Sequence, residues 1–475
     1  MSQNETSRSN WLALFVIGSA ACLNAYDLSS MAVAMASIRN SLSFSPAEVP
    51  WINGAYSLAF GGFLLLGGRL GDVHGRRRII LFGSVLSAGC SVLSALSPHP
   101  VPFLIAQVCK GVGAALMVPN VYALINNLFD AGNARHKALA VFAFCGEGGF
   151  AAGNFFGGVL SNYSWRLVFA PSIVLGVSVA FIAYGCLPNT VHKKPSGGLD
   201  ILGAFLSSLG FAASILAITN CLDLGIRSPV TLSFLGAAVV LLGAFVWRMW
   251  HHEAPLVPPQ FLRNRYVLGA AGVAFFFMGG GMGIFVQLVL FMQDVLKYSP
   301  EATGTALIPF VMMTLTSAYL IDRFLNGLGF RTTILCGLGS IFICFPFFAG
   351  LGPHSTYWGA IFPIMVWFNL SYPLPGYGVR PPAGMGVAPE GQGTAYALHL
   401  SVEQFGITFG VTTASAASAA ASHGERTMPA LVHGFHVAAG LAAAYIAIAF
   451  LIATVAFARV GKVPLLAGIS PVAAE

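Results

Sequence analysis

Long apolar stretches separated by short polar segments run through the whole chain. Fourteen of them are long enough to cross about 30 Å of hydrocarbon as helices. They lack the alternation of apolar and polar residues that a barrel strand shows, so we predict membrane-spanning helices rather than a β-barrel. The predicted spans are 11–35, 50–69, 79–98, 102–126, 137–160, 165–187, 199–219, 228–249, 267–293, 303–322, 331–351, 356–376, 391–418 and 431–458.

Composition supports the same fold class. Of the 475 residues, 56% are hydrophobic and only 8% are charged, whereas a soluble protein carries about 25% charged residues. Too little polar surface remains to cover a water-soluble body, so lipid must surround most of the chain. We therefore predict an all-α polytopic membrane protein, in which the 55 glycines and 26 prolines serve close packing and helix breaks.

Two longer polar segments, 188–198 and 251–265, divide the spans into groups of six, two and six. We expect a six-helix bundle at 1–198, a linker helix pair at 199–250 and a second six-helix bundle at 251–475. A degenerate internal repeat supports paired halves. Asp72, Gly75 and three arginines follow the second span of the first half, and Asp322, Arg323, Gly329 and Arg331 occupy the corresponding place in the second.

The distribution of lysine and arginine predicts orientation. With the N-terminus inside, the inner segments hold most of the 23 lysines and arginines, and the outer ones hold only Arg39, Arg166, Arg227, Lys297 and Arg426. Both termini are then cytoplasmic. The net charge of +7 follows from this bias. No basic patch with interleaved aromatic residues occurs, so we expect no nucleic-acid partner.

Four charged residues interrupt the apolar runs, namely Asp27, Lys110, Glu147 and Glu403. Each costs several kcal/mol in the membrane unless it is paired or hydrated, so they are candidates for proton coupling. A purely structural ion pair or a side chain that snorkels to the interface is the alternative interpretation. Asp27 and Lys110 lie about equally far from the outer ends of two antiparallel spans, and we predict a salt bridge between them that protonation of Asp27 releases.

The segment Gly68–Arg78 (GRLGDVHGRRR) joins the second and third spans. Asp72 accepts hydrogen bonds at a helix end, and Gly75 permits the turn. Arg76, Arg77 and Arg78 reach carboxylates or helix C-termini in one conformation only, which predicts a latch at an inner gate. Topogenic charge alone is the alternative.

Small and polar residues complete the candidate site. Gly149, Gly153 and Gly157 are spaced by four and predict close helix packing, with or without a gating role. The candidate substrate-binding residues are polar or aromatic side chains within the spans, namely Asn24, Tyr26, Gln107, Asn154, Gln287, Asn369, His399 and Gln404.

No feature of the sequence indicates an enzyme. There is no phosphate-binding loop, no paired nucleophile and base, and no Cys/His spacing of a metal site. We expect no cofactor, so that energy comes from a proton gradient or from the gradient of the solute itself.

Taken together, these segments resemble the major facilitator superfamily, in its fourteen-helix branch of drug:proton antiporters. GRLGDVHGRRR is similar to the family's first signature, and NAYDLSSMAVAMASI to the acidic motif of its first helix. SWRLVF (164–169), PLVPPQFLRNR (255–265) and QDVLKYSPEATG (293–304) resemble junctions of this branch. GGFAAGNFFGG and Val118–Asn120 are most similar to fungal aminotriazole-resistance-like exporters.

The resemblance implies a carrier that works by alternating access around a cavity lined by spans 1, 4, 9 and 12; we expect it to be monomeric and to lie in the plasma membrane, with the vacuolar membrane as the alternative. It implies efflux of a drug, toxin or secondary metabolite, with lipid, protons and a small molecule as partners. Gln107 stands where the family has an arginine, and Asn154 where it has a proline. An uptake carrier, an uncoupled facilitator or a non-cycling receptor on the same fold therefore remain alternatives.

Overall fold

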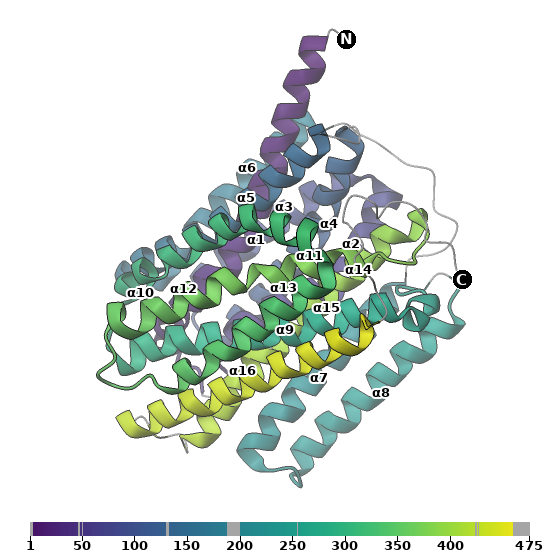
Figure 1. The fold of residues 1–475 in the computed structure, drawn as a ribbon. Coiled ribbons are helices and arrows are strands. Elements are labelled where there is room, and N and C mark those ends of the chain that lie inside the picture. The colour runs from purple at the N-terminus through teal and green to yellow at the C-terminus, as the bar shows by residue number, and fades with distance from the viewer. Residues whose placement is uncertain are drawn as a thin grey trace. The chain divides into compact units, whose positions relative to one another are not determined.

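The computed structural model describes residues 3–45, 48–49, 51–129, 133–187, 200–253, 255–422, 425 and 427–458. Within these ranges every element of secondary structure is a helix, and short turns connect the helices (Figure 1). Each of the fourteen predicted spans falls on helix wherever its residues are described, and among the described residues nine helical stretches are long and apolar enough to cross a membrane by length and composition. The protein is thus an integral, multi-pass membrane protein.

The described residues pack as two units. The first comprises Met1–Ser208, His251–Leu256 and Ser299–Ile308. The second comprises Leu209–Trp250, Val257–Tyr298 and Pro309–Glu475. The boundary predicted at residues 198 and 199 lies outside the described residues, and the three-part division stays a prediction.

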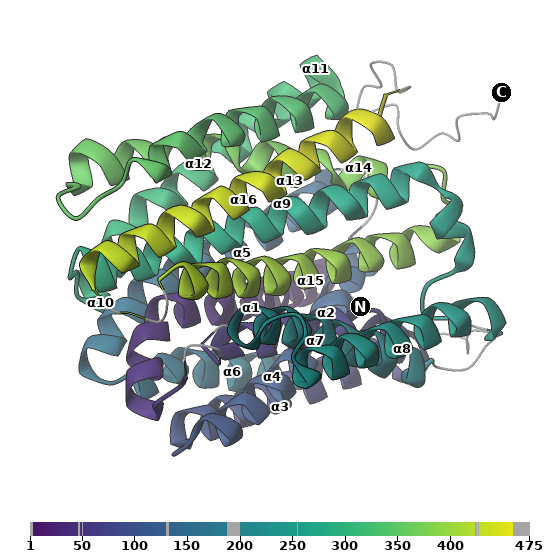
Figure 2. The same cartoon turned by 90° about the horizontal axis from the view of Figure 1, so that it is seen from below.

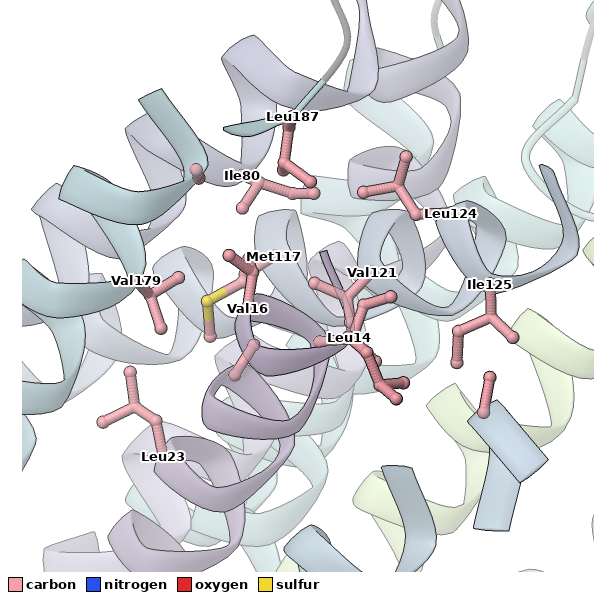
Figure 3. Close-up of a cluster of buried hydrophobic side chains, with 14 residues drawn as sticks. Leu14, Val16, Leu23, Ile80, Met117, Val121, Leu124, Ile125, Val179 and Leu187 are labelled. Carbon is pink, nitrogen blue, oxygen red and sulfur yellow. The ribbon is translucent and has the colours of Figure 1, made fainter. Parts of the chain in front are cut away.

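The helices of the first unit are α1 (Gln3–Leu42), α2 (Trp51–His74), α3 (Arg76–Leu96), α4 (Pro100–Leu128), α5 (Asn133–Tyr163), the short η1 (Trp165–Phe169), α6 (Ala170–Cys186), the start of α7 (Ile201–Leu224) and α10 (Pro300–Ala306). Buried apolar side chains of α1, α3, α4 and α6 meet in its core. Figure 3 shows Val16 of α1 beside Met117 and Val121 of α4 in this cluster.

The helices of the second unit are the rest of α7, α8 (Pro229–His251), η2 (Pro259–Arg263), α9 (Arg265–Leu290), η3 (Phe291–Val295), α11 (Ile308–Ala349), η4 (Tyr357–Ile361), α12 (Phe362–Ser371), α13 (Pro373–Gly378), α14 (Arg380–Ala383), α15 (Pro389–Ala421) and α16 (Met428–Ala456). Its helices α9, α15 and α16 pack side by side (Figure 2).

Several helix boundaries differ from the prediction for identifiable reasons. The predicted span 356–376 is broken into η4, α12, α13 and α14 and reaches Ala383. Its prolines, which include Pro373 and Pro375, lack a backbone N–H and interrupt the helical ladder. The predicted spans 303–322 and 331–351 are joined in α11, where Gly329 adopts φ 77° and ψ 161° and separates two helical parts. The α1 helix extends well beyond 11–35 at both ends.

Side chains and prolines mark several helix starts. Asn264 Oδ1 accepts hydrogen bonds from Tyr266 N at 2.9 Å and Val267 N at 3.4 Å, which satisfies free amides at the start of α9. Ser299 Oγ accepts from Ala302 N at 3.1 Å and caps α10, whose first residue is Pro300.

The short helix α10 packs on α5 within the first unit, although it follows α9 in the chain. A Cβ atom on Gly304 would collide with the carbonyl oxygen of Asn154, and one on Gly158 would lie 3.2 Å from the Cα of Gly304. Asn162 Nδ2 donates a hydrogen bond to Glu301 Oε2 at 3.3 Å. The two backbones therefore approach closely because glycine lines both surfaces.

Candidate functional site

A buried ion pair lies at the centre of the first unit. Lys110 Nζ of α4 is 2.7 Å from Asp27 Oδ1 of α1, and the side chains are 1% and 3% exposed. The contact predicted between these residues from their depth is therefore present. Because a single buried charge is costly, each group depends on the other for its charged state.

Two residues of the η1–α6 segment complete the surroundings of this pair. Ser172 Oγ donates a hydrogen bond to Asp27 Oδ1. The ring centroid of Phe169 lies 5.1 Å from Lys110 Nζ, a cation–π contact. Neither residue was predicted. The available signal was the SWRLVF motif, which ends with Phe169 and is followed three residues later by Ser172, since an uncharged serine in an apolar run gives no signal of its own.

Other predicted residues of the first unit bond around the pair rather than to it. Tyr56 OH donates to Asn24 Oδ1 at 2.6 Å, and Tyr26 OH donates to the carbonyl of Val168 at 2.9 Å. Gln107 Nε2 lies 3.2 Å from the sulfur of Met31. Gln107 is thus buried one turn from Lys110 and bonds to a thioether instead of the carboxylate.

The remaining polar candidates of this unit are on α5. Asn154 is fully buried, and neither atom of its side-chain amide has a hydrogen-bond partner. Glu147 is half-buried, whereas the pair's contacts described above come from α1, α4 and α6. An unsatisfied buried amide is costly, which makes Asn154 a candidate for contact with a polar ligand.

The predicted glycine face of α5 packs directly against α1. Cβ atoms on Gly149, Gly153 and Gly157 would collide with Cys22, Tyr26 and Ser30, respectively. The contacts advance by four residues, about one helical turn, in the same direction along α5 and along α1, so the two helices run parallel. This contact places α1, and with it Asp27, against an uninterrupted glycine surface.

The second unit repeats this arrangement with α9 and α15. Cβ atoms on Gly406 and Gly410 would collide with the backbones of Phe275 and Gly279, respectively. Here too both series advance by four residues, and the helices run parallel. The helix pairs α1–α5 and α9–α15 thus share the same parallel, glycine-lined contact.

The α2–α3 junction contains the predicted latch residues. Gly75 adopts φ 93° and ψ 127°, a conformation that favours glycine. Arg76 Nη2 is 3.0 Å from Asp72 Oδ1, and its Nη1 donates to the carbonyl of Ala123 in α4 at 2.9 Å. Arg77 donates to the carbonyl of Tyr184 at the end of α6.

Not all of the predicted latch takes part in these contacts. Arg78 is exposed. A Cβ on Gly68 would meet only Pro119 at 3.7 Å, which is ordinary contact, so Gly68 is not required for packing. The close contacts are at Gly67 and Gly71, where an added Cβ would collide with α4. Their spacing of four was the signal that the sequence offered.

The corresponding junction of the second unit has the same backbone geometry. Gly329 has a positive φ as Gly75 does, and Arg331 Nη1 donates to the carbonyl of Ala458 after α16 at 3.3 Å. In each unit the arginine two residues after the glycine thus donates to a carbonyl at the end of a later helix, which is α6 in the first unit and α16 in the second. The side chains of Asp322 and Arg323 lie outside the described residues.

The predicted residues of the second unit form a separate polar group on α15. His399 Nε2 is 4.0 Å from Glu403 Oε2, and Arg380 interacts electrostatically with both side chains. His399 Nδ1 and Gln404 Oε1 are buried without hydrogen-bond partners. This group can form hydrogen bonds with a ligand, and His399 or Glu403 can bind a proton.

Two further candidates of this unit are held by their neighbours. Gln287 Nε2 donates to Ser415 Oγ at 3.0 Å, which links α9 to α15. Asn369 Nδ2 donates to the carbonyl of Met365 at 2.7 Å, and its Oδ1 has no partner. The roles of all these residues in coupling and binding stay predictions.

Comparison with known proteins identifies relatives along most of the chain. A family model described as Major Facilitator Superfamily matches residues 17–411. The cephamycin export protein CmcT of Amycolatopsis lactamdurans is 30% identical over 405 residues, which cover 84% of this chain and 83% of that protein. The puromycin resistance protein pur8 of Streptomyces alboniger is 32% identical over 448 residues, covering 91% and 88%.

Solved structures with little sequence identity share the fold. The nucleoside transporter NupG superposes with a TM-score of 0.64 at 11% identity and covers 94% of this chain and 100% of that chain. The POT family transporter PepTSo superposes with a TM-score of 0.64 at 18% identity, covering 94% and 97%. At such low identity these matches concern the fold alone.

Proposed function

The chain belongs to the major facilitator superfamily, and we propose that it exports a small organic molecule in exchange for protons by alternating access. It is a membrane transporter and not an enzyme. Relatives that are named for cephamycin export and for puromycin, lincomycin and methylenomycin A resistance support export of a drug, toxin or secondary metabolite.

The buried Asp27–Lys110 pair carries the proposal of proton coupling. While Asp27 is charged, the pair holds α1 and α4 together at one point. A proton on Asp27 removes one of the two charges and leaves Lys110 without its counter-ion, which the protein must compensate by rearranging or by hydrating the amine. Binding and release of one proton thus favour different conformations of the same helices.

A proton that moves down its electrochemical gradient supplies free energy for export. One proton that crosses a membrane potential of 100 mV releases about 2.3 kcal/mol, before any pH gradient is added. Such a carrier needs no bound cofactor. We also propose that it functions as a monomer in the plasma membrane. The proposed cytoplasmic location of both termini is supported by the excess of lysines and arginines in the predicted inner segments.

Each unit offers polar groups for a substrate. Asn154 in the first unit and His399, Gln404 and Asn369 in the second have buried side-chain atoms without partners. Buried polar atoms of this kind gain most from a ligand that hydrogen-bonds to them. We propose that substrates carry an apolar body and a few hydrogen-bonding groups.

Drug accumulation in efflux-deficient cells tests the function. We would compare wild type with Asp27→Asn, using puromycin, lincomycin and other amphiphilic antibiotics with and without a protonophore. Wild type should lower accumulation of at least one compound, and both the substitution and the protonophore should abolish this effect. Glu253→Gln, which removes an exposed carboxylate of the α8–η2 segment, is the matched control and should behave as wild type.

An uptake carrier or an uncoupled facilitator is the second candidate, and Gln107 favours it. This buried amide bonds to Met31 and has no charge to assist a proton. Higher accumulation in wild type, or transport that ignores both Asp27→Asn and the protonophore, would establish that alternative and overturn proton-coupled export. Saturable binding without any change in accumulation would indicate a receptor that does not cycle.

A further inference from the structure

The SWRLVF motif forms a rigid corner beside the buried ion pair. Its residues make η1 and lead directly into α6. Phe103 of α4 packs edge-on against both Trp165 and Phe169, with ring centroids 6.1 Å apart in each case. Trp165 and Phe169 also contact each other edge-on at 6.3 Å. Three mutually packed rings of this kind fix the direction of the chain at the corner.

Polar contacts fix the same corner from the other side. Ser164 Oγ accepts a hydrogen bond from Arg166 N at 3.3 Å and begins the turn. The Arg166 guanidinium lies 4.4 Å from the Trp165 ring centroid, and its Nη2 donates to the carbonyl of Ser97 at 3.3 Å. The corner is thereby attached to the end of α3.

Three contacts connect this corner to the ion pair. The Tyr26 hydroxyl donates to the carbonyl of Val168 at 2.9 Å. The Phe169 ring lies 5.1 Å from Lys110 Nζ. Ser172 Oγ, on the first turn of α6, donates to Asp27 Oδ1, the same oxygen that accepts from Lys110. Ser172 is 1% exposed, so water cannot take its place at the carboxylate without a rearrangement.

We propose that Ser172 is a positioning residue that sets the proton affinity of Asp27, and that the preceding corner, residues 164–169, holds it in place. A hydroxyl donates a stronger hydrogen bond to a charged carboxylate than to a neutral carboxyl group. Ser172 therefore favours the charged form of Asp27, as Lys110 does. This inference rests on the proposed function only in that the proton on Asp27 drives transport.

The other helices around Asp27 contribute groups of a different kind. On α5, Gly149 and Gly153 pack against α1 at Cys22 and Tyr26, respectively. Among the described residues, the titratable groups known to interact with Asp27 include Lys110 of α4, Tyr56 of α2, and Tyr26 and Cys22 of α1. Of these, Lys110 is the basic partner. The Ser172 hydroxyl donates to the same oxygen as Lys110 without carrying a charge, so its removal leaves both charges of the ion pair in place.

Infrared titration of the purified full-length protein tests this directly and needs no substrate. The absorption of the protonated Asp27 carboxyl is obtained as the difference between each variant and the same variant with Asp27→Asn. Ser172→Ala removes one hydrogen bond to a charged group, and the midpoint should move up by about one pH unit. Ser172→Thr keeps the hydroxyl and should stay close to wild type.

Ser178→Ala is the matched control. This half-buried serine is on the same helix, about 9 Å further along at 1.5 Å per residue. In Ser178→Ala the titration midpoint of Asp27 should equal that of wild type. A general loosening of α6 would instead shift the midpoint by the same amount in both alanine variants. A Ser172→Ala midpoint equal to that of wild type, or equal shifts in the two alanine variants, would overturn the positioning role.

The same variants separate this inference from the proposed function. If the midpoint moves with Ser172 while drug accumulation ignores Asp27→Asn and the protonophore, the positioning role holds and proton-coupled export fails. If accumulation depends on Asp27 but the midpoint ignores Ser172, export holds and the positioning role fails.

Discussion

Removal of Lys110 should make the stability of the protein depend steeply on pH. In Lys110→Met, Asp27 loses its counter-ion in a site that is 3% exposed. A charged carboxylate cannot remain there unpaired, so the folded variant holds Asp27 neutral. An aspartic acid in water loses its proton above about pH 4. The unfolded variant is therefore charged at neutral pH, whereas the folded one binds a proton.

The size of the effect follows from this difference. Keeping one carboxyl neutral at pH 7 costs about 4 kcal/mol, which is three units at about 1.4 kcal/mol each. Because the folded variant binds one more proton than the unfolded one, its stability falls by about 1.4 kcal/mol for each unit of rising pH. The penalty disappears near pH 4. Wild type retains Lys110 as the counter-ion of Asp27, so its stability should fall less steeply over the same pH range.

Thermal unfolding of the purified protein in detergent, followed from pH 4 to 8, measures the slope. The double variant Asp27→Asn/Lys110→Met removes both charges and should recover most of the stability at pH 7. Lys297→Met removes an exposed lysine and is the matched control. If Lys110→Met unfolds like this control at every pH, Asp27 does not depend on Lys110 and the reasoning is wrong.

Three further outcomes follow from the glycine contacts and the α2–α3 junction. Gly149→Ala places a Cβ 2.7 Å from a backbone Cα of α1 and should cost about 1–3 kcal/mol of stability in thermal unfolding. Gly148→Ala, with open space around it, should cost little. Gly75→Ala forces alanine to φ 93° and should cost about 1–3 kcal/mol of stability, whereas Gly68→Ala should be tolerated. Equal losses of stability in Gly149→Ala and Gly148→Ala, or in Gly75→Ala and Gly68→Ala, would contradict the geometry. Asp72→Ala should keep the free energy of unfolding within about 0.5 kcal/mol of the wild-type value, because the Asp72 side chain is 49% exposed. The same substitution should slow transport, and an unchanged transport rate would refute the latch.

The helices could be predicted because each apolar run has to satisfy its own backbone hydrogen bonds in lipid. The Asp27–Lys110 contact could be predicted because two charges at one depth in antiparallel helices have few other partners. Contacts between uncharged residues could not be predicted in this way. Ser172 looks like any small residue of an apolar helix, and its role depends on α6 lying against α1.

The choice among glycines shows the same limit. Gly67 and Gly68 are adjacent, and only the position of α4 decides that the first must be glycine while the second has room. The breaks after η4 arise from prolines that the sequence contains, but hydropathy alone does not reveal whether such a helix bends or stops. The periodicity of small residues thus identifies the packing face of a helix, but only the position of the neighbouring helix determines which of those residues must be glycine.

The contact between α10 and α5 has a consequence for the order in which the protein folds during synthesis. Unit membership does not follow chain order, because Ser299–Ile308 belongs to the first unit while α9, made earlier, belongs to the second. At about 5–20 residues per second, the ribosome needs roughly 3–10 s to progress from Leu256 to Ile308. During this interval the α10-facing surface of α5, with Gly158 and Asn154, lacks its native partner. The first unit is therefore completed only after insertion of the second has begun.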